Sequence, residues 1–312
     1  MRSFYKLTKT MIESLKTEEA IKITHIGDLH RSHLTKDKEQ EDLVKFILEG
    51  FPHYIVISGD TIDSTQVLED KKTKEDTLTF LDKVSIVPTI LGLGSHDYDY
   101  RVSKKISKSG WQYKFPHEFW DNVGQIKNVH LLHNSIYQDE RICFVGYTQP
   151  HEYYFNEHKG EDVTVMIRDL QILDFARQID PSKLTLANIH SPELFQDPSL
   201  APLLRIYDLI LSGHMHNGCV PPLLDEIWKS NTGLIEPQKK IIAKNARGMF
   251  NIGTEEKPTL VNVTGGIVKI QESAPKVLQP FNKCFPMSID ELTITKGPKT
   301  KIYSRSSSYY FR

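Results

Sequence analysis

The apolar residues of this chain follow two spacings that alternate along it. Short apolar runs at residues 21–26, 54–58, 87–91, 184–189 and 209–212 predict buried β-strands. The segments 38–49, 71–84 and 163–178 place apolar side chains three or four positions apart, as Leu43, Phe46 and Ile47 do, which predicts helices. The β-α-β-α-β order of the first half indicates neighbouring parallel strands joined by right-handed crossovers.

The rest of the chain predicts a second sheet and two peripheral segments. Further strands are expected at 129–132 and 141–146, and short β runs follow residue 230 at 259–263, 267–270 and 291–294. A single α/β domain would span residues 21–300. Residues 1–20 would be an N-terminal extension with a short amphipathic helix through Met11, Ile12 and Leu15. That helix would pack on the domain or, alternatively, lie on a membrane surface. Residues 301–312 would be a mobile polar tail.

Polar motifs follow several of the apolar runs. They are Asp28-Leu29-His30, Gly59-Asp60-Thr61-Ile62-Asp63, Gly94-Ser95-His96-Asp97, the lone His190 and Gly213-His214-Met215-His216. The carboxyl end of a strand is where an α/β sheet presents polar side chains to a ligand. One such motif arises easily by chance, whereas this ordered series indicates one shared site.

The residue types in these motifs are those that bind divalent metals. Imidazole and carboxylate hold Mn, Fe, Zn or Ni, and carboxylates also hold Mg. Two ions about 3.5–4 Å apart can clamp the oxygens of a phosphoryl group during in-line displacement. Strand alternation would send Asp28 and His30 to the same side, toward one ion. The same spacing would place His214 and His216 on one side, or at different ions if the backbone bends between them.

The motif series resembles that of the calcineurin-like metallophosphoesterase superfamily, which reads D-x-H, G-D-x-x-D/N, G-N-H-E/D, H and G-H-x-H. The similarity extends from residue 28 to residue 216. Residues 245–292 are similar in outline, more loosely, to the strand-rich tail of its bacterial phosphohydrolases. The resemblance implies a four-layer α-β-β-α sandwich of two mixed β-sheets with flanking helices.

The resemblance also implies roles for the motif residues. One ion would be held by Asp28, His30, Asp60 and His216, and the other by Asp60, Ser95, His190 and His214. A hydroxide bridging the ions would attack phosphorus. His96 would stabilise the phosphoryl group and protonate the leaving oxygen, Asp97 would hydrogen-bond His96 and orient it, and Asp63 would support the loop.

Ser95 stands where the superfamily has asparagine. A serine hydroxyl is shorter than the asparagine side chain, and its neutral oxygen is a poorer metal ligand. Ser95 would reach the ion directly or through a water, or the second site would fill weakly or only with substrate, or the chain is an impaired or altered member. We favour a site that holds two ions, the second less tightly.

Two aromatic segments and three single residues are the candidates for contact with the substrate. The aromatic segments 98–120 and 151–159 would either form a substrate-binding wall or pack on the domain as loop anchors. Tyr98, His33 and Arg247 are the candidate substrate contacts. His25 is predicted to be structural, because strand alternation turns it away from Asp28 or places it beneath the site.

Composition narrows the classes of function. The formal net charge is −1, from 39 Lys and Arg and 40 Asp and Glu, which argues against general nucleic-acid binding. Three scattered cysteines form no disulfide framework and suit a reducing, cytoplasmic compartment. No apolar run approaches the roughly 20 residues of a transmembrane helix. Peripheral membrane association remains open.

The sequence therefore predicts a metal-dependent phosphohydrolase with two divalent ions. Its substrate would be a phosphomonoester or phosphodiester, either a small molecule or linked to a lipid. One alternative is a non-catalytic scaffold with a weakened second metal site at Ser95, against which the intact motif histidines argue. The other is a nuclease of the same fold, against which the near-neutral charge argues.

Overall fold

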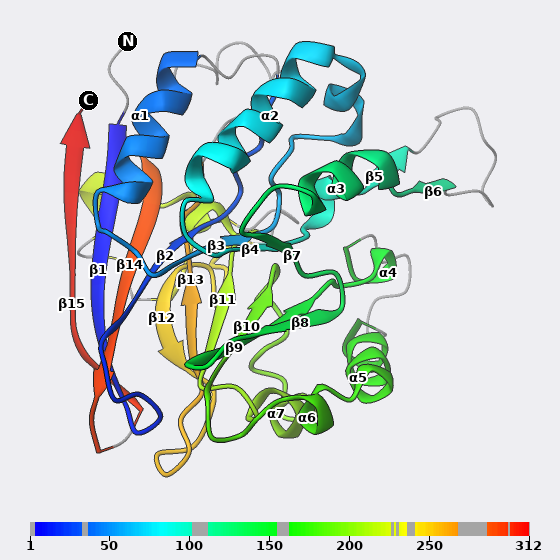
Figure 1. The fold of residues 1–312 in the computed structure, drawn as a ribbon. Helices are drawn as coiled ribbons and strands as arrows, with labels where there is room; N and C mark the ends of the chain where they lie inside the picture. The colour runs from blue at the N-terminus through cyan, green and yellow to red at the C-terminus, as the bar shows by residue number, and fades with distance from the viewer. Residues whose placement is uncertain are drawn as a thin grey trace.

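The computed structural model describes residues 4–32, 37–101, 112–154, 162–225, 228, 231–235, 241–267, 286–298 and 300–311. Two large β-sheets dominate them (Figure 1). In order across the sheet, the seven-stranded one contains β15 (Lys301–Phe311), β1 (Phe4–Ser14), β14 (Met287–Lys296), β2 (Ile21–Ile26), β3 (Tyr54–Ser58), β4 (Thr89–Gly92) and β7 (Val129–Leu131). The six-stranded sheet contains β12 (Gly248–Asn251), β13 (Leu260–Val263), β11 (Leu209–Ser212), β10 (Leu184–Ile189), β9 (Ile142–Tyr147) and β8 (Ser135–Gln138).

Helices cover the outer face of each sheet. On the seven-stranded sheet lie α1 (Asp37–Leu48), α2 (Lys71–Val84) and α3 (His117–Gly124), and on the six-stranded sheet lie α5 (Asp162–Leu173), α6 (Phe175–Gln178) and α7 (Ala201–Leu204). The remaining elements are α4 (His151–Tyr154), the hairpin of β5 (Asp99–Arg101) and β6 (Gln112–Lys114), and the short 3-10 turns η1 (Thr65–Glu69), η2 (Ser95–Asp97), η3 (His216–Cys219) and η4 (Pro222–Leu224).

A third apolar cluster lies between the two sheets. It joins side chains of the first sheet, such as Ile23 and Val56, to side chains of the second, such as Phe144 and Leu186. Both sheets therefore bury two faces, one against the other sheet and one against helices. This arrangement confirms the predicted four-layer α-β-β-α sandwich, and both sheets are mixed, because parallel strands are flanked by antiparallel ones.

The predicted strands and crossovers around the motifs are confirmed. Strands β2, β3, β4 and β7 pair in parallel, as do β9, β10 and β11. Helices α1 and α2 occupy the predicted crossover segments, and β14 includes the expected run at 291–294. The predicted helix at 163–178 is two helices, because Asp174 adopts a left-handed conformation (φ 45°) that ends α5. Ile267 forms an isolated bridge to Met287, and 268–270 lie outside the described residues.

The prediction of an N-terminal helix is wrong. Residues 4–14 form β1, which pairs in parallel with β14 from Tyr5 to Ser14. The spacing of Met11, Ile12 and Leu15 is compatible with a short helix. Pairing with two strands from the far end of the chain satisfies the backbone of this segment as a strand instead.

The prediction of a mobile polar tail is also wrong. β15 runs antiparallel to β1 along its whole length, from Phe4 opposite Phe311 to Glu13 opposite Lys301. Its serines suit an exposed edge strand, and the hydroxyls of Ser307 and Thr8 lie 3.1 Å apart across the pair. The two segments set apart in the sequence therefore belong to the seven-stranded sheet.

Candidate functional site

The motifs lie together because they all follow parallel strands. β2, β3 and β4 lead into the first three, and β10 and β11 lead into His190 and residues 213–216. Backbone hydrogen bonds hold successive loops side by side, from Asp28 to Gly59 (3.0 Å) and from Gly213 to His190 (2.9 Å). Between the sheets, the backbone N–H of His214 donates to the Asp28 carboxylate at 2.9 Å. The stacked sheets thus bring residues that are distant in sequence to one edge.

Left-handed backbone conformations aim the motif side chains into the site. Asp28, His30, Asp60, His214 and His216 all have φ between 42° and 68°. Such values are uncommon for residues other than glycine and cost on the order of 1–3 kcal/mol where the residue is strained. The expectation that simple strand alternation orients these residues is wrong, because each lies beyond the end of its strand.

The motif side chains gather in two compact groups, each able to hold a metal ion. One contains Asp28, His30 and His216, and the other contains Asp60, His190 and His214, with ligand atoms in each group within 4.8 Å of one another. His214 and His216 thus belong to different groups, as expected for a bent backbone. Oδ2 of Asp60 lies 3.1 Å from Nε2 of His190 and 3.9 Å from Nε2 of His30. Asp60 therefore lies between the two groups.

The donor atoms fit a divalent metal. Both ring nitrogens of His30, Nε2 of His214 and Nδ1 of His216 are buried and make no hydrogen bond to a described residue. An unsatisfied buried polar atom costs about 1–3 kcal/mol, which a bound ion would remove. Nδ1 of His190 lies 2.6 Å from the carbonyl oxygen of Ser58. This contact turns Nε2 toward the site, as is usual for a metal-binding histidine.

Burial and mutual charge set the protonation of these groups. Burial is the main cause that lowers the pKa of His30 and His214 well below the usual histidine value. Neutral imidazole is the form that binds metal. Burial alone would raise the pKa of the Asp60 carboxyl, but His190, His96 and His30 outweigh it and hold that pKa well below its usual range. The site therefore presents the ionised Asp60 carboxylate beside the neutral imidazoles of His30 and His214. Burial alone would lower the pKa of His190, but the Asp60 charge outweighs it and raises that pKa to about 9.

His96 is oriented by Asp63. Its Nδ1 lies 2.5 Å from the carbonyl oxygen of Asp63, and its backbone N–H donates to Oδ1 of Asp60 at 2.8 Å. Burial alone would lower the pKa of His96, but the Asp60 charge and the Asp63 carbonyl raise it above its usual value. Because a carbonyl only accepts, Nδ1 of His96 carries a proton and Nε2 remains for a ligand.

The expected hydrogen bond between Asp97 and His96 is not formed among the described residues, although the charge of Asp97 adds to the rise in the pKa of His96. The Asp97 carboxylate is completely buried and accepts the backbone N–H groups of Gly94 (2.8 Å), Thr61 (2.9 Å) and Ile62 (3.3 Å). Burial, reinforced by the Asp60 charge, raises the pKa of Asp97 to about 7. Asp97 therefore ties the loop that carries His96 to the loop that carries Asp60.

Asp63 contacts two histidines of the site. Beyond its carbonyl contact with His96, its Oδ1 lies 3.6 Å from Nδ1 of His30. His30, Asp63 and His96 form a third group compact enough for a cation. The available signal was the spacing of Asp63 three residues after Asp60, which returns the loop to the site.

The sequence of this chain matches a known protein family. The family model for calcineurin-like phosphoesterases matches residues 21–218, the segment that contains every motif. The chain belongs to the calcineurin-like phosphoesterase family. No curated protein sequence matches it significantly.

The chain is similar to two solved structures at low sequence identity. Phosphopantetheinyl hydrolase (PptH) from Mycobacterium tuberculosis is 12% identical with a TM-score of 0.41, and the match covers 80% of this chain and 91% of that one. GAP50, the anchor in the inner membrane complex of Plasmodium, is also 12% identical with a TM-score of 0.41, over 94% of this chain and 80% of that one.

Glycines allow the loops of the site to pack closely against each other. A Cβ atom at Gly94 would lie 2.3 Å from Oδ1 of Asp60, and one at Gly59 would lie 2.6 Å from the backbone nitrogen of Gly94. Gly59 also has a left-handed φ of 85°. Larger residues at either position would push the loops of Asp60 and His96 apart.

Ser95 lies beside the second group of ligands. It is buried, and its Oγ is 3.5 Å from Oδ2 of Asp60, the oxygen that also faces His190. The substitution of serine for the family asparagine therefore falls at the edge of the Asp60, His190 and His214 group.

Two of the candidate substrate contacts are engaged by other parts of the fold. Arg247 is buried and its guanidinium pairs with Asp225 and donates to the carbonyls of Thr232 and Trp228 (both 3.1 Å). Tyr98 is buried in the core under α3, where its hydroxyl donates to the carbonyl of Gln149 at 2.8 Å. His33 lies outside the described residues.

The described aromatic residues of the two segments lie in different surroundings. In 98–120, Phe119 and Trp120 are core anchors, and residues 102–111 lie outside the described part. In 151–159, Tyr153 is buried, whereas Tyr154 is half-buried with its ring 5.4 Å from that of His214 and 6.1 Å from that of His190. Among the described residues of this segment, Tyr154 is therefore the aromatic residue that borders the candidate metal-binding groups.

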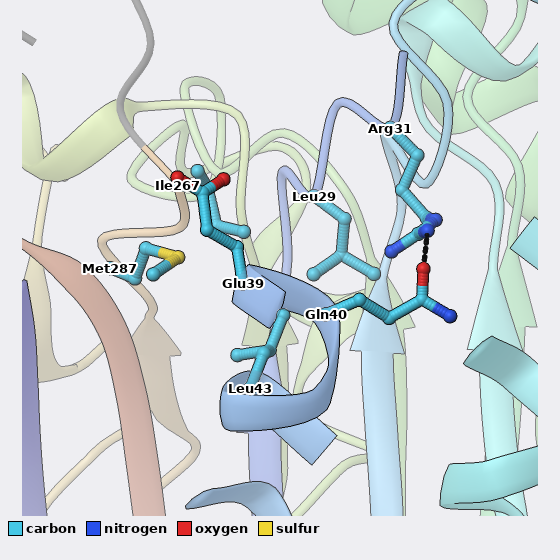
Figure 2. Close-up of a pocket in the computed structure, with 7 residues that line it drawn as sticks. All are labelled: Leu29, Arg31, Glu39, Gln40, Leu43, Ile267 and Met287. Carbon is cyan, nitrogen blue, oxygen red and sulfur yellow. Dashed lines mark hydrogen bonds between the residues drawn. The ribbon is translucent and has the colours of Figure 1, made fainter. Parts of the chain in front are cut away.

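A small pocket lies behind the first motif (Figure 2). It has a volume of about 20 Å³ and is lined by Leu29, Arg31, Glu39, Gln40, Leu43, Ile267 and Met287. Arg31 is bound to Gln40, as the figure shows, and its guanidinium also lies over the Phe80 ring at 4.8 Å. None of the candidate metal ligands lines this pocket, so it is separate from the two candidate metal-binding groups.

Two further observations concern the surroundings of the site. His25 is completely buried and bridges Ser58 (2.9 Å) and Asn262 (2.8 Å), so the prediction of a structural histidine is confirmed.

Within the described part of the chain, no helix has the length and apolar character needed to cross a membrane.

Proposed function

We propose that this phosphoesterase hydrolyses phosphomonoesters or phosphodiesters at the edge where its two sheets meet. Asp28, His30, Asp60 and His216 would hold one divalent ion, and Asp60, His190 and His214 the other, with Ser95 as a weak or water-mediated ligand. The observation that supports this most is the pair of adjacent ligand groups with Asp60 between them. Bound ions of the Mn, Fe, Zn, Ni or Mg type would polarise the phosphoryl oxygens and lower the pKa of water.

The chain's own residues supply orientation and protons. The Asp63 carbonyl holds Nδ1 of His96, so Nε2 of the same ring is directed to the substrate. Since the pKa of His96 is raised, the ring can carry a second proton near neutral pH and give it to the leaving oxygen. Asp97 keeps this loop against the Asp60 loop through three backbone hydrogen bonds and needs no contact with the substrate.

The expected substrate is a small-molecule or lipid-linked phosphate ester. The net charge of −1 gives no support to general nucleic-acid binding. A cytoplasmic location stays a prediction from the cysteine content.

The test uses metal-stripped protein with bis-p-nitrophenyl phosphate and p-nitrophenyl phosphate, to which Mn, Fe, Zn, Ni or Mg is returned. We expect metal-restored turnover that disappears in Asp60→Ala, and the faster substrate distinguishes diesterase from monoesterase. Absence of turnover with every metal, despite measured metal binding, would favour the non-catalytic scaffold. Digestion of single- and double-stranded DNA in the same assay would favour the nuclease.

A further inference from the structure

The buried side chain of Gln149 organises one flank of the second ligand group. β9 and β10 pair in parallel up to Tyr147 opposite Ile189, so Gln149 and Ser191 follow side by side. The Gln149 side chain accepts the N–H of Ser191 at 2.6 Å and donates to the carbonyl of Ser191 at 3.1 Å. It thereby continues the ladder past the strand ends, next to His190.

The same amide oxygen anchors Tyr154. The Tyr154 hydroxyl donates to Oε1 of Gln149 at 3.0 Å. Tyr154 ends α4, which lies between α3 and α5 (Figure 1). The hydroxyl proton is thus engaged with Gln149, and the ring stays half-buried beside His190 and His214.

The ring of Tyr154 lies beside the two imidazoles of the second ligand group. Its centroid lies 5.4 Å from that of His214 with the planes tilted by 58°, and the rings of His190 and His214 are themselves 5.0 Å apart. A phosphoryl group at these imidazoles would have its neighbouring substituent within reach of Tyr154. Because the hydroxyl proton is already donated, the ring carbons are what Tyr154 can offer to that substituent.

We propose that Tyr154 is a specificity-determining residue that favours phosphate esters with an aromatic ring joined directly to the ester oxygen. The inference rests on the proposed function, since it places the phosphate at the second ligand group. An aromatic pair contributes about 0.5–1.5 kcal/mol beyond burial, which corresponds to roughly a two- to tenfold preference. A substituent held farther from phosphorus, such as the base of a nucleotide, gains nothing from this ring.

Binding of non-hydrolysable ligands tests the inference without turnover. Calorimetry with the Mn-loaded protein would compare phenylphosphonate, methylphosphonate and AMP. We expect phenylphosphonate to bind about two- to tenfold more tightly than methylphosphonate. Tyr154→Ala should remove this preference while leaving methylphosphonate, AMP and Mn affinities unchanged. Tyr154→Phe, which keeps the ring, should retain the preference, and Tyr303→Ala, at an exposed tyrosine on β15, should behave as the wild type.

The outcomes separate the two proposals. Equal affinity for both phosphonates in the wild type, or an unchanged preference in Tyr154→Ala, would overturn the role of Tyr154. If Tyr154→Ala lost affinity for AMP but not for phenylphosphonate, this role would also be overturned, since the ring would then contact a base held far from the phosphate. If the phenyl preference depends on Tyr154 but no ester is hydrolysed, the proposed function fails and the binding role of Tyr154 stands.

Discussion

At the scale of single residues, the site depends on conformations that most residues avoid. Five candidate ligands occupy left-handed backbone positions, and this cost must be offset by the packing and hydrogen bonds of the loops around them. Asp97 illustrates the compensation, because its one carboxylate satisfies three backbone N–H groups from two loops.

The serine at position 95 leads to the first prediction. Ser95→Asn would place a longer side chain with an amide oxygen beside Oδ2 of Asp60, so the second ion should bind more tightly than in the wild type. Calorimetric titration of stripped protein with Mn would measure both sites. Equal, tight occupancy of both sites in both forms would show that Ser95 does not weaken the second one.

The second prediction concerns His96. His96→Asn removes the ring nitrogen directed at the leaving group, so kcat should fall by about 10²–10⁴-fold, the usual contribution of a general acid. Metal affinity should change little, because His96 is outside the two main ligand groups. Steady-state kinetics with parallel metal titration would check this. A loss of bound metal as large as the loss of kcat would instead make His96 a ligand.

At the scale of secondary-structure elements, buried polar contacts join strands that pattern alone would not pair. Asp225, which follows η4, contacts Lys6 of β1, Arg247 just before β12, and Tyr309 of β15 at 2.8 Å. The side chains of Lys6, Asp225 and Arg247 are each no more than 8% exposed. Both terminal strands are thus tied to the chain that follows the His214 motif.

Removal of the Asp225 charge should be strongly destabilising. Asp225→Asn would leave two buried cations without their carboxylate, and breaking one partner of a buried pair costs about 3–5 kcal/mol. Urea denaturation would measure the free energy of unfolding. Glu18→Gln, which breaks the exposed pair with Lys296, is the matched control and should cost less than about 1 kcal/mol. Equal effects of the two changes would contradict the proposed role of burial.

His25 links the two sheets and predicts a pH effect. Burial lowers the pKa of His25 to about 3, below the usual 6.5, so the folded protein excludes a proton that the unfolded chain binds. Its contribution to stability is therefore complete above pH 6.5 and is lost as the pH falls from 6.5 toward 3. His25→Gln lacks this titration. As the pH falls from 6.5 toward 3, the wild type should lose more free energy of unfolding than the variant does. A difference between the two that stays constant over this range would contradict the lowered pKa of His25.

At the scale of the whole molecule, the site lies at the edge where two sheets of one core meet. The candidate ligands come from loops of both sheets, so a metal ion held by them would stabilise the entire fold. At an ion concentration 100 times its Kd, the gain is about 2.7 kcal/mol per site. We expect Mn to raise the Tm of stripped protein and a chelator to reverse the change. Asp60→Ala should show a much smaller rise, whereas an equal rise would place the ion elsewhere.

The sequence by itself determined the strands that carry the motifs and the residue types gathered at their ends. The strands at 184–189 and 209–212 could be predicted because strands buried on both faces are continuously apolar. The intact order of Asp28, Asp60, His190 and His214 gave the metal chemistry, because parallel strands end at one edge.

The tertiary structure alone decided what depends on contacts between distant segments. β1 and β15 are strands because they pair with each other and with β14, a contact absent from any local window. Arg247 points to Asp225, and the Asp63 carbonyl, rather than Asp97, orients His96. Periodicity reports which face of an element is apolar. Which polar atom a side chain meets depends on loop conformations such as the left-handed turn at Asp60, and on contacts between the sheets such as that of His214 with Asp28.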